Sequence, residues 1–279
     1  MGEVRFEAMG TWGHVIVHGG PVDGCERARR RIDDLERRWS RFLPDSEVSR
    51  LNAGATVVSP DTALLVARAG DAARMTGGRF DATVLGAVVR AGYDHAAALV
   101  QKTHRGGKPS RTEGFDPGGI GKGLAADMVV DELMAAGSDG VGVNLGGDLR
   151  VEGVPPGGRP WVIDVEDPFG GGGPPLVRLG LNRGAIATSS RLKRAWVAED
   201  GSPRHHLIDP RTGEPAVTDA VAATVVAGTA WRAEAVATAA VVAGISEGLA
   251  LIESTGVTGL LVAEDGHVHT AAGLGPYLG

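Results

Sequence analysis

The chain has 279 residues, of which 43% are hydrophobic and 22% are charged, enough for one large domain or two closely packed ones. Its formal net charge of −6 argues against a general nucleic-acid binder, because such proteins need a basic face to displace counterions from phosphates. No apolar run is long enough to span a bilayer and no signal peptide or lipid-anchor segment is visible, so we expect a cytoplasmic protein without a membrane segment.

The first predicted elements are a pair of strands and an arginine-rich helix. Val4 to Val17 has β-rich, partly alternating character broken at Gly10 and Gly13, which predicts a hairpin or two short strands. Apolar residues then recur at three- and four-residue steps, as in an amphipathic helix: Cys25, Ala28, Ile32, Leu35, Trp39 and Phe42. The arginines between positions 27 and 41 are interleaved with acidic residues, so we interpret most of them as the solvated face of this helix.

Helices and short strands alternate irregularly along the rest of the chain. Pro60 starts a helix that should run to about Met75, and Ala230 to Val242 predicts an alanine-rich helix closed by Gly244. We expect strands near 141–151, 161–166, 176–181, 184–188, 221–227 and 257–263. Residues 101–114 and 167–175 are polar or glycine-rich and are predicted surface loops. This order of elements indicates an α+β architecture.

A glycine-rich segment, Gly118 to Gly123, leads into an apolar-periodic helix that continues through Leu133. Free backbone N–H groups and the positive end of the dipole at a helix N-terminus favour bound phosphate, and Lys122 adds a positive charge. The segment is neither a Walker A sequence nor a Rossmann fingerprint. Taken alone, it fits equally a tight turn with Lys122 in solvent.

Glu234 and Thr238 lie four residues apart on the predicted Ala230 helix, so their oxygens project from one face. One carboxylate and one hydroxyl make a sparse site of hard oxygens, which suits Mg²⁺ completed by water and substrate phosphate. The alternative is an ordinary surface contact on a helix. An isolated Glu/Thr pair would favour that alternative.

Two imidazoles and an acid are concentrated between His205 and Gly213, where Asp209 is followed by Pro210. Imidazole has the unperturbed pKa nearest neutrality, so a histidine before a rigid turn is well placed to move a proton. The same residues also suit a plain turn with two histidines on an edge strand. The other six histidines have no neighbours in the sequence that indicate a site: His14, His18, His95, His104, His267 and His269.

Asn144 to Asp148 interrupts a β-like run with the paired glycines Gly146 and Gly147. Paired glycines in a strand let a flat ligand or another backbone approach closely, and Asn144 and Asp148 supply hydrogen-bonding groups. A β-bulge is the structural alternative, and it is compatible with ligand binding.

Seven motifs follow a fixed order along the chain: Met9-Gly10-Thr11, Ser46 to Asn52, Phe80 to Val84, Phe115 to Asp127, Asn144 to Asp148, His205 to Gly213, and Ala233 to Thr238. In that order they resemble the ApbE-type FAD:protein FMN transferases. The resemblance covers nearly the whole chain. It implies one ApbE-like unit over residues 1–279, either a single domain or two intimately packed subdomains, with mixed or antiparallel sheets, flanking helices and glycine-rich loops at a central cleft.

The resemblance also implies an activity: Mg²⁺-dependent transfer of FMN from FAD to a Thr or Ser hydroxyl of an acceptor protein, with release of AMP. The FAD site would include Met9, Glu47, Asp81, Asp116, Gly118, Gly119, Lys122, Asn144, Gly146, Gly147, Asp148, Thr188, Ser189 and His206. The Gly121 carbonyl, Glu234 and Thr238 would bind Mg²⁺, with Mn²⁺ as an alternative ion. His206 would take the hydroxyl proton with help from Asp209, Lys122 would stabilise phosphate charge, and His205 is the alternative base.

Three positions depart from the family pattern. Glu234 stands where the family usually has Asp, which lengthens the side chain by one methylene. Pro117 replaces an apolar residue such as Leu, and Ser190 replaces Gly. Two alternatives to FMN transfer therefore remain: hydrolysis of FAD to FMN and AMP, and FAD binding without catalysis.

Overall fold

A computed structural model describes residues 1–93, 114–158, 160–170, 172–198 and 201–279. The predicted loop at 101–114, except Gly114, lies outside these residues, as do His95 and His104. The described chain forms an eight-stranded sheet with the order β1-β2-β3-β4-β7-β12-β13-β14, in which every neighbouring pair is antiparallel. Its strands are β1 Gly2–Ala8, β2 Thr11–Gly19, β3 Ser138–Leu145, β4 Asp148–Gly153, β7 Gly184–Ser190, β12 Ala220–Ala227, β13 Thr258–Ala263 and β14 Val268–Thr270. The predicted α+β class is confirmed.

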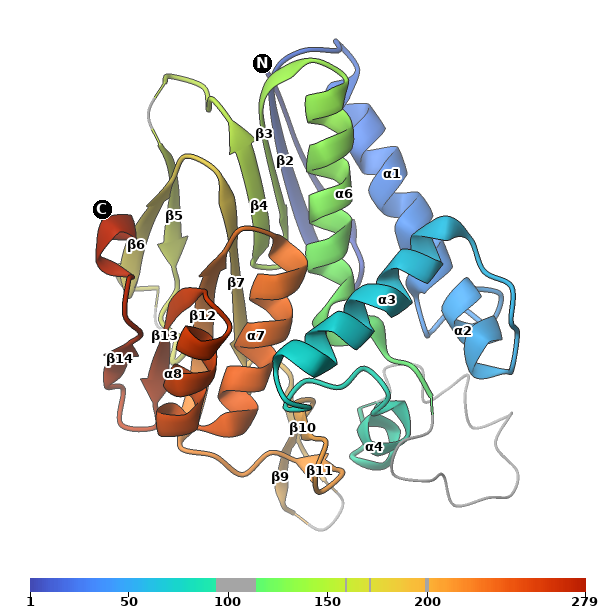
Figure 1. The fold of residues 1–279 in the computed structure, drawn as a ribbon, viewed down its shortest axis with the longest axis vertical. Helices are drawn as coiled ribbons and strands as arrows, with labels where there is room; N and C mark the ends of the chain where they lie inside the picture. The colour runs from blue at the N-terminus through green and yellow to red at the C-terminus, as the bar shows by residue number, and fades with distance from the viewer. Residues whose placement is uncertain (94–113, 159, 171, 199–200) are drawn as a thin grey trace.

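Helices cover the face of the sheet that points toward the viewer in Figure 1. They are α1 Gly24–Trp39, α2 Glu47–Asn52, α3 Pro60–Met75, α4 Leu85–Arg90, α6 Gly121–Ala135, α7 Ala230–Ala243 and α8 Ile245–Ser254. The main core lies between the sheet and α1, α3, α6, α7 and α8. None of the helices in the described residues is long and apolar enough to cross a membrane.

The β1–β2 hairpin confirms the first prediction, with a correction. The turn falls at Met9 and Gly10, both with positive φ, whereas the expected break at Gly13 is wrong because Gly13 lies within β2. Gly13 pairs with Phe6, and a Cβ at position 13 would lie 2.9 Å from the Phe6 ring. The absence of a side chain at Gly13 therefore makes room for the Phe6 ring.

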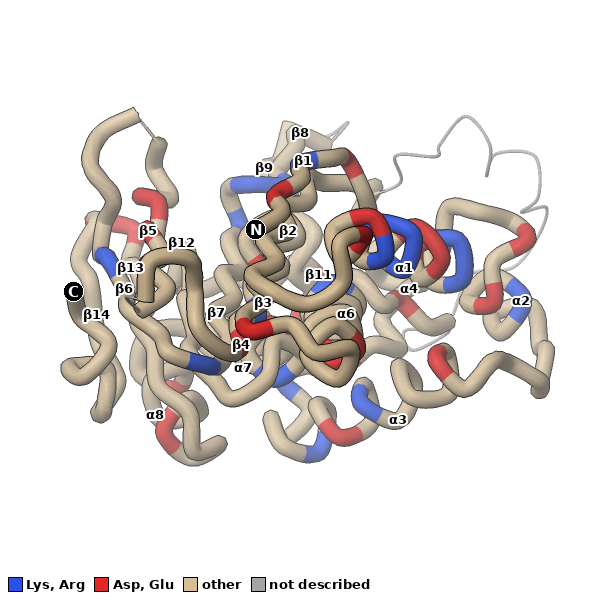
Figure 2. Tube along the Cα trace, turned by 90° about the horizontal axis from the view of Figure 1, so that it is seen from above, with Lys and Arg blue, Asp and Glu red and all other residues tan. Residues whose placement is uncertain are grey.

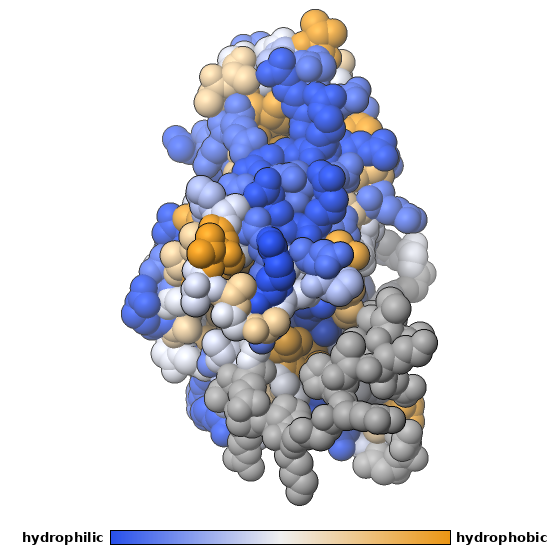
Figure 3. All heavy atoms as spheres, turned by 90° about the vertical axis from the view of Figure 1, so that its right-hand side faces the viewer, coloured by the Kyte–Doolittle hydropathy of each residue, from blue (hydrophilic) through white to orange (hydrophobic). Residues whose placement is uncertain are grey.

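Helix α1 is amphipathic as predicted, and Ala28, Ile32, Leu35 and Trp39 are buried. Its outer face alternates basic and acidic residues (Figure 2), and the upper part of the surface shown in Figure 3 is correspondingly hydrophilic. Phe42 is not the last member of the apolar stripe, because the helix ends at Trp39. The predicted Pro60–Met75 helix has the bounds of α3, with Ser59 as its N-cap.

The predicted strand at 141–151 is wrong as a single element. It is a hairpin of β3 and β4, because Gly146 and Gly147 have φ of +64° and +104° and form the turn. Paired positive φ values favour glycine and suit two-residue hairpins. The turn therefore replaces the β-bulge that we considered, and it directs Asp148 toward the helices.

The opposite face of the sheet is covered by a separate hairpin, β5 Trp161–Val165 and β6 Val177–Leu181, over a second apolar core. The connection between them, at its described positions within 167–175, contains no helix or strand, as expected for a loop. Strand β12 is buried along its whole length because α7 covers one of its faces and this second core the other. Its uniformly apolar sequence follows from that position.

Small elements complete the fold: β8 Ala195–Val197, β9 Pro203–His205, β10 Ile208–Asp209, β11 Glu214–Pro215, and the 3-10 turns Pro117–Gly119 and Gly275–Tyr277. Strand β8 pairs with β9, and β10 pairs with β11. These elements, together with α2, α4, α8 and β14, are too short or too irregular in pattern to have been predicted. They matter because β9 and β10 flank His206.

Candidate active site

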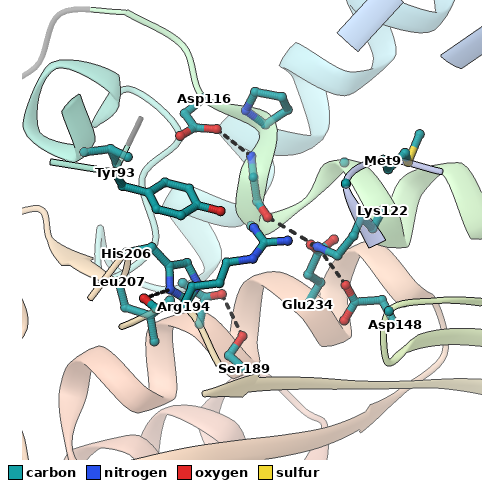
Figure 4. Close-up of a pocket in the computed structure, with 18 of the residues that line it drawn as sticks. Met9, Tyr93, Asp116, Lys122, Asp148, Ser189, Arg194, His206, Leu207 and Glu234 are labelled. Carbon is teal, nitrogen blue, oxygen red and sulfur yellow. Dashed lines mark hydrogen bonds and ion pairs between the residues drawn. The ribbon is translucent and has the colours of Figure 1, made fainter. Parts of the chain in front are cut away.

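A cavity of about 510 Å³ lies where α6, α7, β7 and the small strands meet. It gathers fourteen of the predicted site residues: Met9, Asp81, Asp116, Gly118, Gly119, Gly121, Lys122, Gly146, Asp148, Thr188, Ser189, His206, Glu234 and Thr238. Figure 4 shows Lys122, Asp148 and Glu234 on one side of this space and Tyr93, Arg194 and His206 on the other. Segments more than 200 residues apart in sequence, from Met9 to Thr238, thus line one cavity.

Lys122 is held between two acidic side chains at the start of α6. Its Nζ lies 2.6 Å from Glu234 Oε1 and 2.9 Å from Asp148 Oδ2. Burial by itself would lower the pKa of Lys122, but the two nearby carboxylates outweigh it and hold the pKa above the ordinary value. The lysine is therefore a fixed positive charge, and the alternative of a solvated Lys122 is wrong.

Glu234 is almost fully buried, with 2% of its surface exposed, on a helix made mostly of alanine and valine. Burial and the neighbouring Asp148 carboxylate raise its pKa above the ordinary value, although Lys122 opposes this effect. Its Oε2 accepts a hydrogen bond of 2.8 Å from the Gly123 N–H. The position of this carboxylate excludes a plain surface contact on α7.

Two hydroxyls from β7 and α7 meet beside the acidic group. Ser189 Oγ lies 2.9 Å from Thr238 Oγ1, and Thr188 Oγ1 lies 2.9 Å from Thr224 Oγ1 of the adjacent strand. Ser190, which stands where the family favours Gly, accepts a hydrogen bond from the Leu192 N–H and shapes the following loop. The hydroxyls are thus fixed by strand pairing and helix packing.

The glycine-rich segment forms a short 3-10 turn followed directly by α6. Asp116 is the N-cap of that turn and accepts a hydrogen bond of 2.8 Å from the Gly118 N–H. Pro117 occupies the first position of the turn, where a missing N–H costs little. The N-cap of α6, Ile120, provides no side-chain cap. This helix N-terminus therefore presents backbone donors to the cavity.

His206 lies in the cavity wall opposite Lys122 (Figure 4). Its Nδ1 is 3.4 Å from the Arg194 carbonyl oxygen, which can only accept, so Nδ1 carries the proton and Nε2 has a free lone pair. Burial, reinforced by the Arg194 charge, lowers the pKa of His206 to about 3. The ring is therefore neutral, as a proton acceptor must be.

His205 and Asp209 stabilise the backbone next to His206 and are not part of the cavity lining. His205 Nδ1 accepts from the Leu207 N–H, and its Nε2 donates to the Ala216 carbonyl at 3.0 Å. Both ring nitrogens are used, which argues against His205 as the base. Asp209 accepts from the N–H and the guanidinium of Arg211, so it orders the turn and does not orient the His206 imidazole.

Three more predicted site residues do not line the cavity. Glu47 accepts hydrogen bonds from the N–H and hydroxyl of Ser59, the N-cap of α3. Asn144 Oδ1 accepts from the Gly147 N–H and stabilises the β3–β4 turn. Glu47, Asn144 and Gly147 therefore support the elements around the site in the described structure.

Sequence reasoning missed a group of cavity residues that includes Arg41, Tyr93 and Arg194. Arg41 was grouped with the solvated face of α1, yet its side chain is 8% exposed and lies 3.4 Å from Asp116 Oδ2. The guanidinium groups of Arg41 and Arg194 lie 5.6 Å and 5.8 Å from the centre of the Tyr93 ring. Helix α1 ends at Trp39, before Arg41, whereas the apolar pattern was extended to Phe42 and so placed Arg41 on the helix.

Residues 9–261 match the ApbE family. The chain belongs to the ApbE family. The FAD:protein FMN transferase of Vibrio cholerae is 27% identical over 260 residues, which cover 84% of this chain and 78% of that protein. The protein of the same name from Treponema pallidum is 34% identical over 169 residues, 57% of this chain. This aligned part spans about half, 46%, of the Treponema protein.

The fold is also similar to the folds of solved ApbE proteins. The crystal structure of the ApbE protein from Thermotoga maritima superposes with a TM-score of 0.84 at 27% identity, covering 99% of this chain and 98% of that one. The flavin transferase ApbE from Vibrio cholerae superposes with a TM-score of 0.80 at 24% identity and covers 99% and 98% of the two chains. The predicted family and fold are confirmed.

Proposed function

We propose that this ApbE protein transfers the FMN part of FAD to a Thr or Ser hydroxyl of an acceptor protein and releases AMP. The proposal rests mainly on one observation. The same cavity places a buried Lys122 and hard oxygens on one wall and a neutral His206 on the other. Phosphoryl transfer is accelerated by both functions, charge stabilisation on phosphate and a base for the nucleophile.

The donor set on α7 fits a magnesium ion. Glu234 supplies carboxylate oxygens, Thr238 a hydroxyl one helical turn later, and the carbonyl of Gly121 lines the same cavity. Oxygen ligands with few protein charges suit Mg²⁺, and Mn²⁺ accepts the same ligands. When bound, the ion would neutralise charge on the FAD pyrophosphate. Lys122 and the Gly123 N–H hold the two Glu234 oxygens, so a bound ion would replace one of these donors.

Side chains and backbone N–H groups of this protein would carry out the remaining steps. The acceptor hydroxyl oxygen would form a bond to the FMN phosphorus while the bond from that phosphorus to the bridging oxygen breaks and AMP leaves. The hydroxyl proton would pass to Nε2 of His206, whose Nδ1–H is held by the Arg194 carbonyl. Lys122 and the N–H groups at the start of α6 would stabilise charge on the phosphate oxygens.

The test is mass spectrometry of a Thr-containing acceptor peptide from a relative's substrate, incubated with the protein, FAD and Mg²⁺. A mass gain that corresponds to FMN supports transfer. AMP release at the same rate without peptide indicates hydrolysis, and FAD binding without AMP release indicates a binding protein. Glu234→Gln, which keeps the shape but removes a carboxylate oxygen, should abolish Mg²⁺-dependent transfer. Glu26→Gln, whose exposed carboxylate pairs with Arg30 on α1 away from the cavity, is the matched control.

A further inference from the structure

Helices α6 and α7 cap one another in the interior. Asp127 of α6 accepts hydrogen bonds from the first two N–H groups of α7, at 2.8 Å from Ala230 and 3.0 Å from Trp231. Glu234 of α7 in turn accepts from Gly123 in the first turn of α6. Neither helix has a side-chain cap from its own N-cap residue, so each depends on the other helix for this contact.

The two contacts are separated by one turn on each helix. Asp127 follows Gly123 by four residues on α6, whereas Ala230 precedes Glu234 by four residues on α7. The helices therefore run antiparallel, and the two contacts fix how far one is displaced along the other. Gly123 allows this close approach of the helices, because a Cβ there would lie 2.5 Å from the Ala230 carbonyl oxygen.

Asp127 is itself held firmly. It is 5% exposed, and Arg150 Nε lies 3.3 Å from its Oδ1. Burial raises the pKa of Asp127 to about 6, while the two α7 N–H groups and Arg150 lower it, so the carboxylate is charged at neutral pH. A charged acceptor at a helix N-terminus interacts favourably with the helix dipole.

We propose that Asp127 is a positioning residue for the active site. By capping α7, it sets the position of Glu234 along the helix axis relative to Gly121 and Lys122 on α6. Asp127 does not line the cavity formed by the described residues and acts only through α7. This inference rests on the proposed function in that Glu234 and Gly121 are the ligands it aligns. The alignment of Lys122 follows from the same geometry without a metal.

Asp127→Asn tests the proposal, because it keeps the side-chain shape but removes the charge and one acceptor. Asp131→Asn, one turn later on the exposed face of α6, is the control. Two equilibrium constants are measured on the full chain: Mn²⁺ binding by electron paramagnetic resonance without FAD, and FAD binding by flavin fluorescence in EDTA. We expect the Mn²⁺ Kd to rise at least about tenfold, as when the partner of a metal ligand is lost, and FAD binding to weaken.

Ala230→Pro is the second variant. It removes one N–H at the first helical position, where proline is tolerated, and leaves Asp127 intact. It should weaken the same two constants. Unchanged constants in both variants, with a lower melting temperature, would show a purely structural cap and overturn the proposal. If the wild type binds FAD but no Mn²⁺, the metal assignment under the proposed function fails, and the FAD constant alone decides the role of Asp127.

Discussion

The wall of the cavity that carries Lys122 and Glu234 consists of helices of 15 and 14 residues packed on the central sheet, whereas the wall that carries His206 consists of strands of two or three residues. The first wall is part of the main core. The second packs partly on a small separate cluster that includes Tyr93 and Ile208 and, among the described residues, reaches the main core only through Leu207 and Ala216.

The two walls fix their functional groups by different means. Lys122 and Glu234 are held by helix packing and buried charges, so their geometry depends on the whole core. His206 is held through one backbone group, the Arg194 carbonyl, which accepts from its backbone N–H and from Nδ1. Substitutions in the first wall should therefore change stability and phosphate binding together, while those in the second should change catalysis with little effect on the core.

The largest expected effect comes from His206→Gln, in the second wall. Loss of a general base should lower kcat about 10²–10⁴-fold, while the FAD Kd stays close to that of the wild type because the phosphate-binding wall is intact. Steady-state transfer assays and flavin titration measure the two quantities. A parallel loss of FAD affinity would contradict the proposed separation of the walls.

The pH dependence of the free energy of unfolding should reflect the protonation of His206. Its pKa is about 3 in the folded protein, against 6.5 for the ordinary side chain. As pH falls, the unfolded chain therefore binds a proton at this histidine before the folded chain does. The contribution of the neutral His206 to the free energy of unfolding is complete above pH 6.5 and is lost as pH falls toward 3, at about 1.4 kcal/mol per pH unit. Chemical denaturation between pH 3.5 and 7 should give a shallower slope for His206→Gln than for the wild type.

Gly123→Ala tests the helix wall. The added Cβ would lie 2.5 Å from the Ala230 carbonyl oxygen and 2.8 Å from the Trp231 nitrogen, so the helices must separate. We expect a loss of about 1–3 kcal/mol in the free energy of unfolding, together with weaker phosphate binding. Gly228→Ala, where a Cβ meets nothing within 4 Å, is the matched control. Equal stability of the two variants would refute the close approach.

The smallest effect is expected from His205→Ala. It removes two hydrogen bonds to backbone groups, each worth about 1 kcal/mol. The turn that presents His206 should loosen, so kcat should fall severalfold with unchanged FAD affinity. If His205→Ala were as inactive as His206→Gln, the assignment of the base would have to be reversed.

Local patterns were sufficient for the long elements and for the motifs. The bounds of α3 followed from Pro60 and the glycines after Met75, and the stripe of α1 followed from its periodicity. The hairpin at Gly146 was taken for one strand because the sequence does not reveal φ at paired glycines. Strands of two residues carry no period that could be detected.

The site was predictable where its chemistry is concentrated in a motif. Lys122, Glu234 and His206 were found because each stands in a distinctive segment. Arg41 was missed because its burial depends on Asp116, 75 positions away in the sequence. Glu47, expected to line the FAD site, lies outside this cavity and binds Ser59, because a buried carboxylate that supports a helix N-cap has the same local sequence as one that binds a ligand.

Reciprocal capping has a consequence for adaptation to substrates. Since α6 and α7 each complete the other's first turn, a shift of one helix end would leave buried N–H groups of the other unpaired. The half that carries Lys122 and Glu234 is thus expected to behave as a rigid body. Any induced fit to an incoming acceptor is then expected in the short strands around His206, outside Leu207 and Ala216, which pack in the main core.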